Sequence, residues 1–353
     1  MTSGTRTRGA AVIAVAALGL ACAPPAAGQE SYEISGDVVA VYNLAGTAHV
    51  VRGSGSAVVV RVRRGGGDAE RLRVETGEIR GRQTLRVIYP DDRVVYEEMG
   101  RRSRTTLRVR DDGTFGDGRR GGGERVEIRG SGRGLEAWAD LEIEVPDGVE
   151  FSLYVGRGDL SAEDVSADLR LDVGGGQVQA SGIEGRLVVD TGSGSVQVRD
   201  VTGDLLIDTG SGSVDVAGVR AGQIDIDTGS GGVEGRDLIG DRLRVDTGSG
   251  GVELAAVRAP EVFVDTGSGS VDVELLADVE ELVIDTGSGS VTVTVPEDLG
   301  AEVEIETGSG GIDLDFPVQV RRASRSHVVG RIGDGEGSIV IDTGSGRVRL
   351  IQG

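Results

Sequence analysis

The chain has 353 residues with 37 basic and 58 acidic side chains, and every basic side chain is an arginine. The whole charge of −21 lies in residues 151–353, with 15 arginines and 36 acids, because residues 1–150 hold 22 of each. This charge repels nucleic acid and anionic lipid, so we expect no nucleic-acid partner. The 61 glycines and only ten aromatic residues (1 Trp, 5 Tyr, 4 Phe) argue against an ordinary globular enzyme.

Residues 1–28 have the features of an export signal. Two arginines precede the apolar run Ala10–Ala21, which is too short to span a bilayer. Small residues around Gly28 predict cleavage there and a soluble mature chain, in the periplasm, the outer envelope or the medium. The alternative is a lipobox over Leu18–Cys22, with a lipid anchor on Cys22. No later segment is apolar for long enough to span a membrane, so we expect no transmembrane segment.

Residues 29–146 are predicted to form a divergent β-rich region. Alternating apolar residues indicate strands at Val38–Tyr42, His49–Arg52, Ala57–Arg63, Leu72–Glu75, Leu85–Tyr89, Thr105–Arg110, Arg125–Ile128 and Leu141–Val145. This region either caps the repeats that follow or forms a separate small sandwich. All five tyrosines and Trp138 lie between residues 32 and 154, which favours this end as a binding surface.

A repeat dominates residues 147–353. Asp-Thr-Gly-Ser-Gly begins at Asp190, Asp208, Asp227, Asp246, Asp265, Asp285 and Asp342. Weaker copies begin at Tyr154, Asp172 and Glu306, and the successive spacings are 18, 18, 18, 19, 19, 19, 20, 21 and 36. A period near 19 residues is typical of a solenoid.

Within each period the apolar residues alternate on both sides of the Gly-Ser-Gly turn, as in Val196 and Val198, and a third apolar position follows, as in Val201. Period 2 with β-branched residues predicts strands with one face inward. Each coil is therefore predicted to have two short strands and a third short side. The predicted fold is all-β: a parallel β-solenoid of about ten coils of 18–21 residues, stabilised by neighbouring coils.

The long last spacing predicts an interruption. Residues 317–337 are polar and rich in glycine and arginine, and we expect a loop that leaves the solenoid before a last coil at residues 338–350. Such excursions often carry function, although a loop that only covers the open end is the simpler interpretation.

The repeated acids are predicted to form two columns. One column holds Asp190, Asp208, Asp227, Asp246, Asp265 and Asp285, and the other holds Asp215, Glu234, Glu253 and Asp272. The main interpretation is turn chemistry, in which an aspartate accepts backbone N–H groups and glycine supplies the turn. The alternative is a calcium ladder. Stacked carboxylates repel one another, which should raise their pKa values, and bound Ca²⁺ would relieve that repulsion.

The motifs do not indicate an enzyme. Asp-Thr-Gly also occurs in aspartic proteases, but that chemistry needs two aspartates that share a proton, whereas seven copies here follow one wall. The two histidines, His49 and His327, are far apart in sequence, which argues against a transition-metal cluster. A carbohydrate-active β-helix enzyme remains an alternative, with residues 316–337 as the place where the repeat is broken.

The chain resembles the bacterial adhesin family of exported β-strand-repeat proteins, a domain family of otherwise unknown function. The resemblance rests on residues 139–148 before the solenoid, on Gly156–Leu160 at its first turn, and on the Thr-Gly-Ser-Gly turns that follow. It implies export, a β-solenoid and no catalytic residues. We therefore expect a non-enzymatic protein that binds a cell-surface or envelope ligand, protein or glycan. The alternative is a periplasmic structural or envelope-stress accessory protein.

Overall fold

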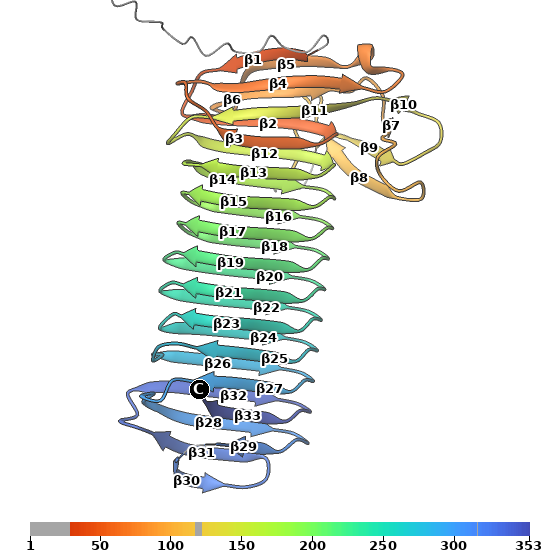
Figure 1. Cartoon of the computed structure of the whole chain (residues 1–353). Helices are drawn as coiled ribbons and strands as arrows, with labels where there is room; N and C mark the ends of the chain where they lie inside the picture. The colour runs from red at the N-terminus through yellow and green to blue at the C-terminus, as the bar shows by residue number, and fades with distance from the viewer. Residues whose placement is uncertain (1–28, 117–121, 316) are drawn as a thin grey trace, which may run out of the picture.

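The computed structural model describes residues 29–116, 122–315 and 317–353. The predicted signal peptide, the cleavage site at Gly28 and Cys22 lie outside the described residues. The described chain forms a long rod of strands stacked like rungs (Figure 1), with one short 3-10 helix, η1 (Ala69–Arg71). The predicted parallel β-solenoid is confirmed, since the strands of successive coils pair in parallel along two sheets.

Two long sheets, A and B, form the walls of the rod. The strands of sheet A, in spatial order, are β1 (Gln29–Ile34), β4 (Val58–Gly65), β11 (Trp138–Val145), β3 (Ala48–Arg52), β13 (Leu160–Val165), β15 (Val178–Glu184), β17 (Val196–Thr202), β19 (Val214–Arg220), β21 (Val233–Ile239), β23 (Val252–Arg258), β25 (Val271–Leu275), β27 (Val291–Val295), β33 (Val348–Gln352) and β29 (Ile312–Leu314). Those of sheet B are β30 (Gln319–Ala323), β31 (His327–Ile332), β28 (Ala301–Thr307), β32 (Gly337–Thr343), β26 (Glu281–Thr286), β24 (Glu261–Thr266), β22 (Arg242–Thr247), β20 (Gln223–Thr228), β18 (Leu205–Thr209), β16 (Leu187–Thr191), β14 (Asp168–Val173), β12 (Glu150–Arg157), β2 (Val38–Ala45), β6 (Arg82–Ile88) and β5 (Arg73–Ile79).

The third apolar position of each coil does not form a strand of its own. In the coil of β17, Val196, Val198 and Val201 are all fully buried, although the last two are three residues apart. Asp200 lies between them with φ of 54°, and this left-handed residue bends the strand so that both valines face inward. The third side of the coil is therefore a bend within the sheet A strand.

The turns require glycine because neighbouring coils approach closely there. A Cβ on Gly250 would lie 1.9 Å from the carbonyl oxygen of Gly231 in the preceding coil. The threonine of the motif points inward and is buried, and Thr247 Oγ1 donates a hydrogen bond to that same carbonyl oxygen at 3.1 Å. The Asp-Thr-Gly-Ser-Gly motif is thus a stacking element between coils.

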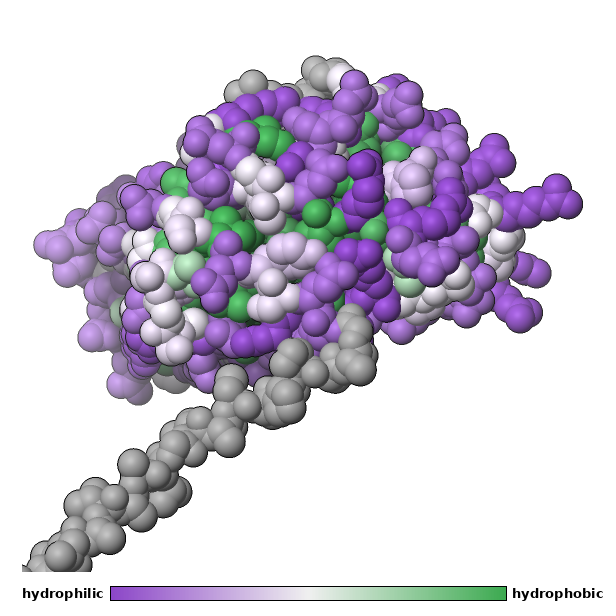
Figure 2. All heavy atoms as spheres, turned by 90° about the horizontal axis from the view of Figure 1, so that it is seen from above, coloured by the Kyte–Doolittle hydropathy of each residue, from purple (hydrophilic) through white to green (hydrophobic). Residues whose placement is uncertain are grey.

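The first region extends both sheets and closes one end of the rod. Strands β2 and β3 pair in parallel with β12 and β13, and β4 pairs antiparallel with β1 and β11. Tyr32 of β1 and Val74 of β5 are partly buried against the main core. Figure 2 looks down on this end and shows apolar side chains between polar ones.

A small sheet C covers part of sheet B beside this end. It comprises β10 (Leu135–Glu136), β7 (Arg93–Val95), β9 (Glu124–Arg129) and β8 (Arg104–Val109). A second core lies beneath it, in which the rings of Tyr42 and Tyr154 stack at 4.6 Å and Phe115 meets Tyr42 edge-on. Tyr42, Tyr96 and Tyr154 are at most 4% exposed. The prediction that these aromatics mark a binding surface is therefore wrong for these three tyrosines.

The C-terminal end departs from the expected order. The last coil, β32 and β33, does not stack at the end but lies between the coil of β26 and β27 and the coil of β28 and β29. Residues 317–337, expected to be a loop, form a hairpin of β30 and β31 that pairs antiparallel with β28. The side chains of His327–Ile332 alternate between buried and partly buried, as in a strand. Its backbone pairs with the edge of β28 that would otherwise be open, which explains why this segment is a strand.

Candidate binding surfaces

Sheet B carries a row of carboxylates on its outer face. The strands from β16 to β26, and then β32, pair without a register shift. Seven carboxylates therefore lie side by side in adjacent strands: Asp190, Asp208, Asp227, Asp246, Asp265, Asp285 and Asp342. We call these seven residues the sheet B acidic row. Each lies one residue before the buried threonine, which fixes its side chain outward.

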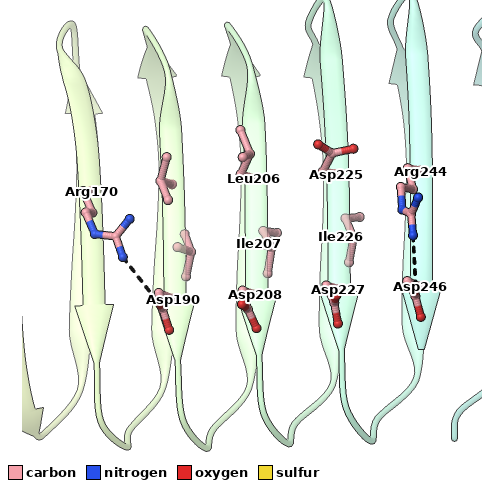
Figure 3. A pocket seen from close by; sticks show the side chains of 12 residues that line it. Arg170, Asp190, Leu206, Ile207, Asp208, Asp225, Ile226, Asp227, Arg244 and Asp246 are labelled. Atoms are coloured by element: carbon pink, nitrogen blue, oxygen red, sulfur yellow. Dashed lines mark hydrogen bonds and ion pairs between the residues drawn. The ribbon is translucent and has the colours of Figure 1, made fainter. Parts of the chain in front are cut away.

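A shallow groove of about 360 Å³ lies beside the first four residues of this row, Asp190 to Asp246 (Figure 3). Outward-facing Val188 and Leu206 contribute apolar surface to it. Arginines bound it at either end. Arg170 lies 3.2 Å from Asp190, and Arg244 lies 3.2 Å from Asp246.

The two acids between these ion pairs, Asp208 and Asp227, have raised pKa values. Burial and, secondarily, the neighbouring Asp190 raise the pKa of Asp208. Burial raises the pKa of Asp227, and the carboxylates of Asp246 and Asp208 add to this effect. The same causes, burial first and then Asp265 and Asp342, raise the pKa of Asp285. The row therefore holds carboxylates that a cationic partner would stabilise, and two of them, Asp208 and Asp227, line the groove.

The second predicted column lies on the outer face of sheet A. Asp215, Glu234, Glu253 and Asp272 occupy equivalent positions of β19, β21, β23 and β25. Across residues 29–116, 122–315 and 317–353, no group of three or more His, Cys, Asp or Glu side chains is arranged to hold a metal ion. The calcium ladder stays a prediction, which a thermal melt with added calcium and then with chelator would test.

The hairpin of residues 317–337 is held to the terminal coil by strand pairing and by an ion pair between Arg321 and Glu302. Arg321 contacts Glu302 at 2.8 Å, and His327 Nε2 lies 3.4 Å from Glu304. Within the hairpin, Ser324 Oγ accepts a hydrogen bond from the backbone N–H of His327 at 3.0 Å, which closes its turn.

A polar hollow on sheet A was not predicted from the sequence. It has a volume of about 330 Å³ and is lined by Thr47, Ala48, His49, Asp159, Leu160, Ser161, Gln177 and Gln179. His49 Nδ1 and Ser161 Oγ lie 2.7 Å apart because β3 and β13 pair with these residues side by side. His49 precedes the repeat, so its place beside Ser161 follows only from the pairing of the first region with the solenoid.

No helix in the described part of the chain is both long enough and apolar enough to cross a membrane.

Comparison with known proteins identifies a family. Two solved structures, each 10% identical, match 92% of this chain: a candidate cell adhesion protein from Clostridium sporogenes ATCC 15579 (99% of its length, TM-score 0.23) and a candidate adhesin from Bacteroides fragilis NCTC 9343 (96%, TM-score 0.33). These scores are too low to bear on function. No curated protein matches. The model of the Toastrack DUF4097 family matches residues 139–350, which is more than half of the chain, so the chain belongs to that family.

Proposed function

We propose that this protein is an exported, non-enzymatic binding protein, an adhesin or cell-envelope interaction protein that contacts its partner through the outer face of sheet B. The observation that supports the proposal most strongly is the sheet B acidic row, which repeats one carboxylate per coil beside the groove. Acids in register along a rod suit an extended contact with a basic partner. They do not converge on one reacting atom, as a catalytic site requires.

The first experiment is the accessibility of an epitope-tagged copy on intact cells. We expect protease and antibody to reach the tag without breaking the envelope. If the tag is reached only after the envelope is opened, the adhesin proposal fails, and the protein is instead a periplasmic structural or envelope-stress accessory protein.

A pair of charge variants tests the surface itself. Changing Asp208, Asp227, Asp265 and Asp285 to asparagine removes four charges from sheet B, and changing Asp215, Glu234, Glu253 and Asp272 to their amides removes four from sheet A. We expect only the sheet B variant to lose binding to cells or isolated envelopes. Equal binding by both variants would contradict the assignment of this face.

A further inference from the structure

We propose that the polar hollow on sheet A binds a neutral polyhydroxylated ligand, namely sugar residues of a glycan. This inference goes beyond the proposed function, which concerns a basic partner on sheet B, because it assigns a different class of ligand to a surface on sheet A. The residues that we expect to contact the ligand are His49, Ser161, Gln177, Gln179 and the free carboxylate oxygen of Asp159.

The outward row of sheet A changes chemistry at the hollow. In β19, β21, β23 and β25 this row carries the carboxylates Asp215, Glu234, Glu253 and Asp272. In β3, β13, β15 and β17 the row holds hydrogen-bonding side chains without a carboxylate: His49, Ser161, Gln179 and Gln197. The buried side of these strands keeps its apolar pattern, so packing does not require the change.

The turn beside this row changes as well. The residue before the sheet A strand is serine or glycine in the middle coils, as in Ser213 and Gly232. At the hollow the same position carries Thr47, Asp159 and Gln177. Larger polar side chains at this position form one wall of the hollow, and the row on the strands forms its floor.

The hydrogen-bonding groups are already oriented. Ser161 Oγ is held at 2.7 Å by His49 Nδ1, and Gln179 Nε2 donates to Gln197 Oε1 at 3.3 Å. Asp159 Oδ1 accepts from the backbone N–H of Gln177 at 2.8 Å. Each contact fixes one side of its group and leaves a second hydrogen-bonding position toward solvent. Adjacent strands lie about 4.8 Å apart, so donors and acceptors recur at roughly the length of a sugar ring.

The lining selects against other ligand classes. The apolar residues in it, Ala48 and Leu160, are 3% and 2% exposed, so the apolar part of its surface comes mainly from the carbon atoms of polar side chains, as a sugar ring with both C–H and hydroxyl groups requires. The net charge of −21 disfavours an anion, and a polycation would find more carboxylates on either acidic row. A ligand with many neutral hydroxyl groups matches the hydrogen-bonding side chains that line the hollow. Because the lining has no Trp, Tyr or Phe ring, we expect a dissociation constant on the order of millimolar for one site.

The paired serine and histidine could suggest hydrolysis, since a base beside a hydroxyl activates it. Acyl transfer also needs donors aimed at the developing oxyanion. The backbone amides beside this pair are engaged in the ladder, with Ala48 N–H donating to Asp159 O at 3.0 Å and Leu160 N–H to Gln177 O at 2.9 Å. We therefore assign binding and not catalysis to this site.

The test uses the chain from Gln29 to Gly353 and a panel of neutral hexaoses: cellohexaose, maltohexaose and mannohexaose. Saturation-transfer NMR and a titration should show binding of at least one sugar. In Ser161→Ala/Gln179→Ala the affinity should fall at least about tenfold. The matched control is Thr292→Ala, at the equivalent position of β27, which should bind like the wild type. Unfolding curves of all variants verify that each is folded.

Two results would overturn the inference: no member of the panel binds the wild type, or the double variant binds as well as the Thr292→Ala control. Release of cleaved sugar during the titration would contradict our choice of binding over catalysis. The outcome is separable from that of the proposed function. An accessible tag with no sugar binding removes only this inference, whereas sugar binding by a chain found only inside the envelope removes only the adhesin proposal.

Discussion

From β14 to β25 every coil pairs with the coils immediately before and after it in sequence, whereas at the C-terminal end β32 lies between β26 and β28. The two regions share the same motif and the same buried apolar rows. They differ in whether chain order equals spatial order. The motif therefore specifies how two coils stack on each other, but it does not specify which two coils are neighbours.

Engineered disulfides test that difference most directly, with an all-or-none result. In a Cys22→Ser chain, Asp285→Cys/Asp342→Cys should form a disulfide, because these residues are register partners in strands about 4.8 Å apart. Asp285→Cys/Glu306→Cys should not, because β32 separates β26 from β28. Non-reducing gels and mass spectrometry distinguish the two pairs. A disulfide only in the second pair would mean that the coils stack in sequence order.

The turn glycines should give the largest change in stability. Gly250→Ala should lower the free energy of unfolding by about 2–4 kcal/mol, since its Cβ would lie 1.9 Å from Gly231 O. The adjacent Gly251→Ala is the matched control, because its nearest neighbour, Ser270 O, is 3.5 Å away. Denaturant unfolding followed by circular dichroism measures both. Equal losses would show that close approach between coils is not what requires glycine at position 250.

The buried threonines should give a smaller effect that changes along the rod. Thr247 Oγ1 donates to Gly231 O, whereas Thr209 is equally buried and its hydroxyl has no hydrogen-bond partner among the described residues. Thr247→Val should cost about 1 kcal/mol, and Thr209→Val should be neutral or stabilising. Unfolding curves of the two variants, recorded under the same conditions, provide the comparison. A loss of stability in Thr209→Val would show that its hydroxyl does find a partner.

The same two regions show how far the sequence predicts the structure. The regular spacing from Asp190 to Asp285 predicted the in-register acids, because a coil of fixed length places equal positions side by side. The step from Glu306 to Asp342 predicted only an interruption, since β28 and β32 end in nearly the same motif and the sequence does not show which of them pairs with β26. The sequence did not predict the hollow at His49. His49 lies outside the repeat, so only the pairing of β3 with β13 places it beside Ser161.

The smallest expected effect concerns the sheet B acidic row and pH. Because burial and the neighbouring carboxylates raise the pKa of Asp227, the folded chain binds this proton more readily than the unfolded chain. Its charge therefore opposes folding at neutral pH, and this cost disappears as the pH falls through the raised pKa. Asp227→Asn should stabilise the fold at pH 7 by less than about 1 kcal/mol, since solvent screens the row. It should also reduce the stability gained between pH 7 and about pH 4. Asp246→Asn is the comparison and should give a smaller gain, because it relieves the repulsion on Asp227 but also removes the ion pair with Arg244. If both variants stabilise the chain equally, repulsion along the whole row, and not the position of Asp227 between the two ion pairs, sets the pH dependence.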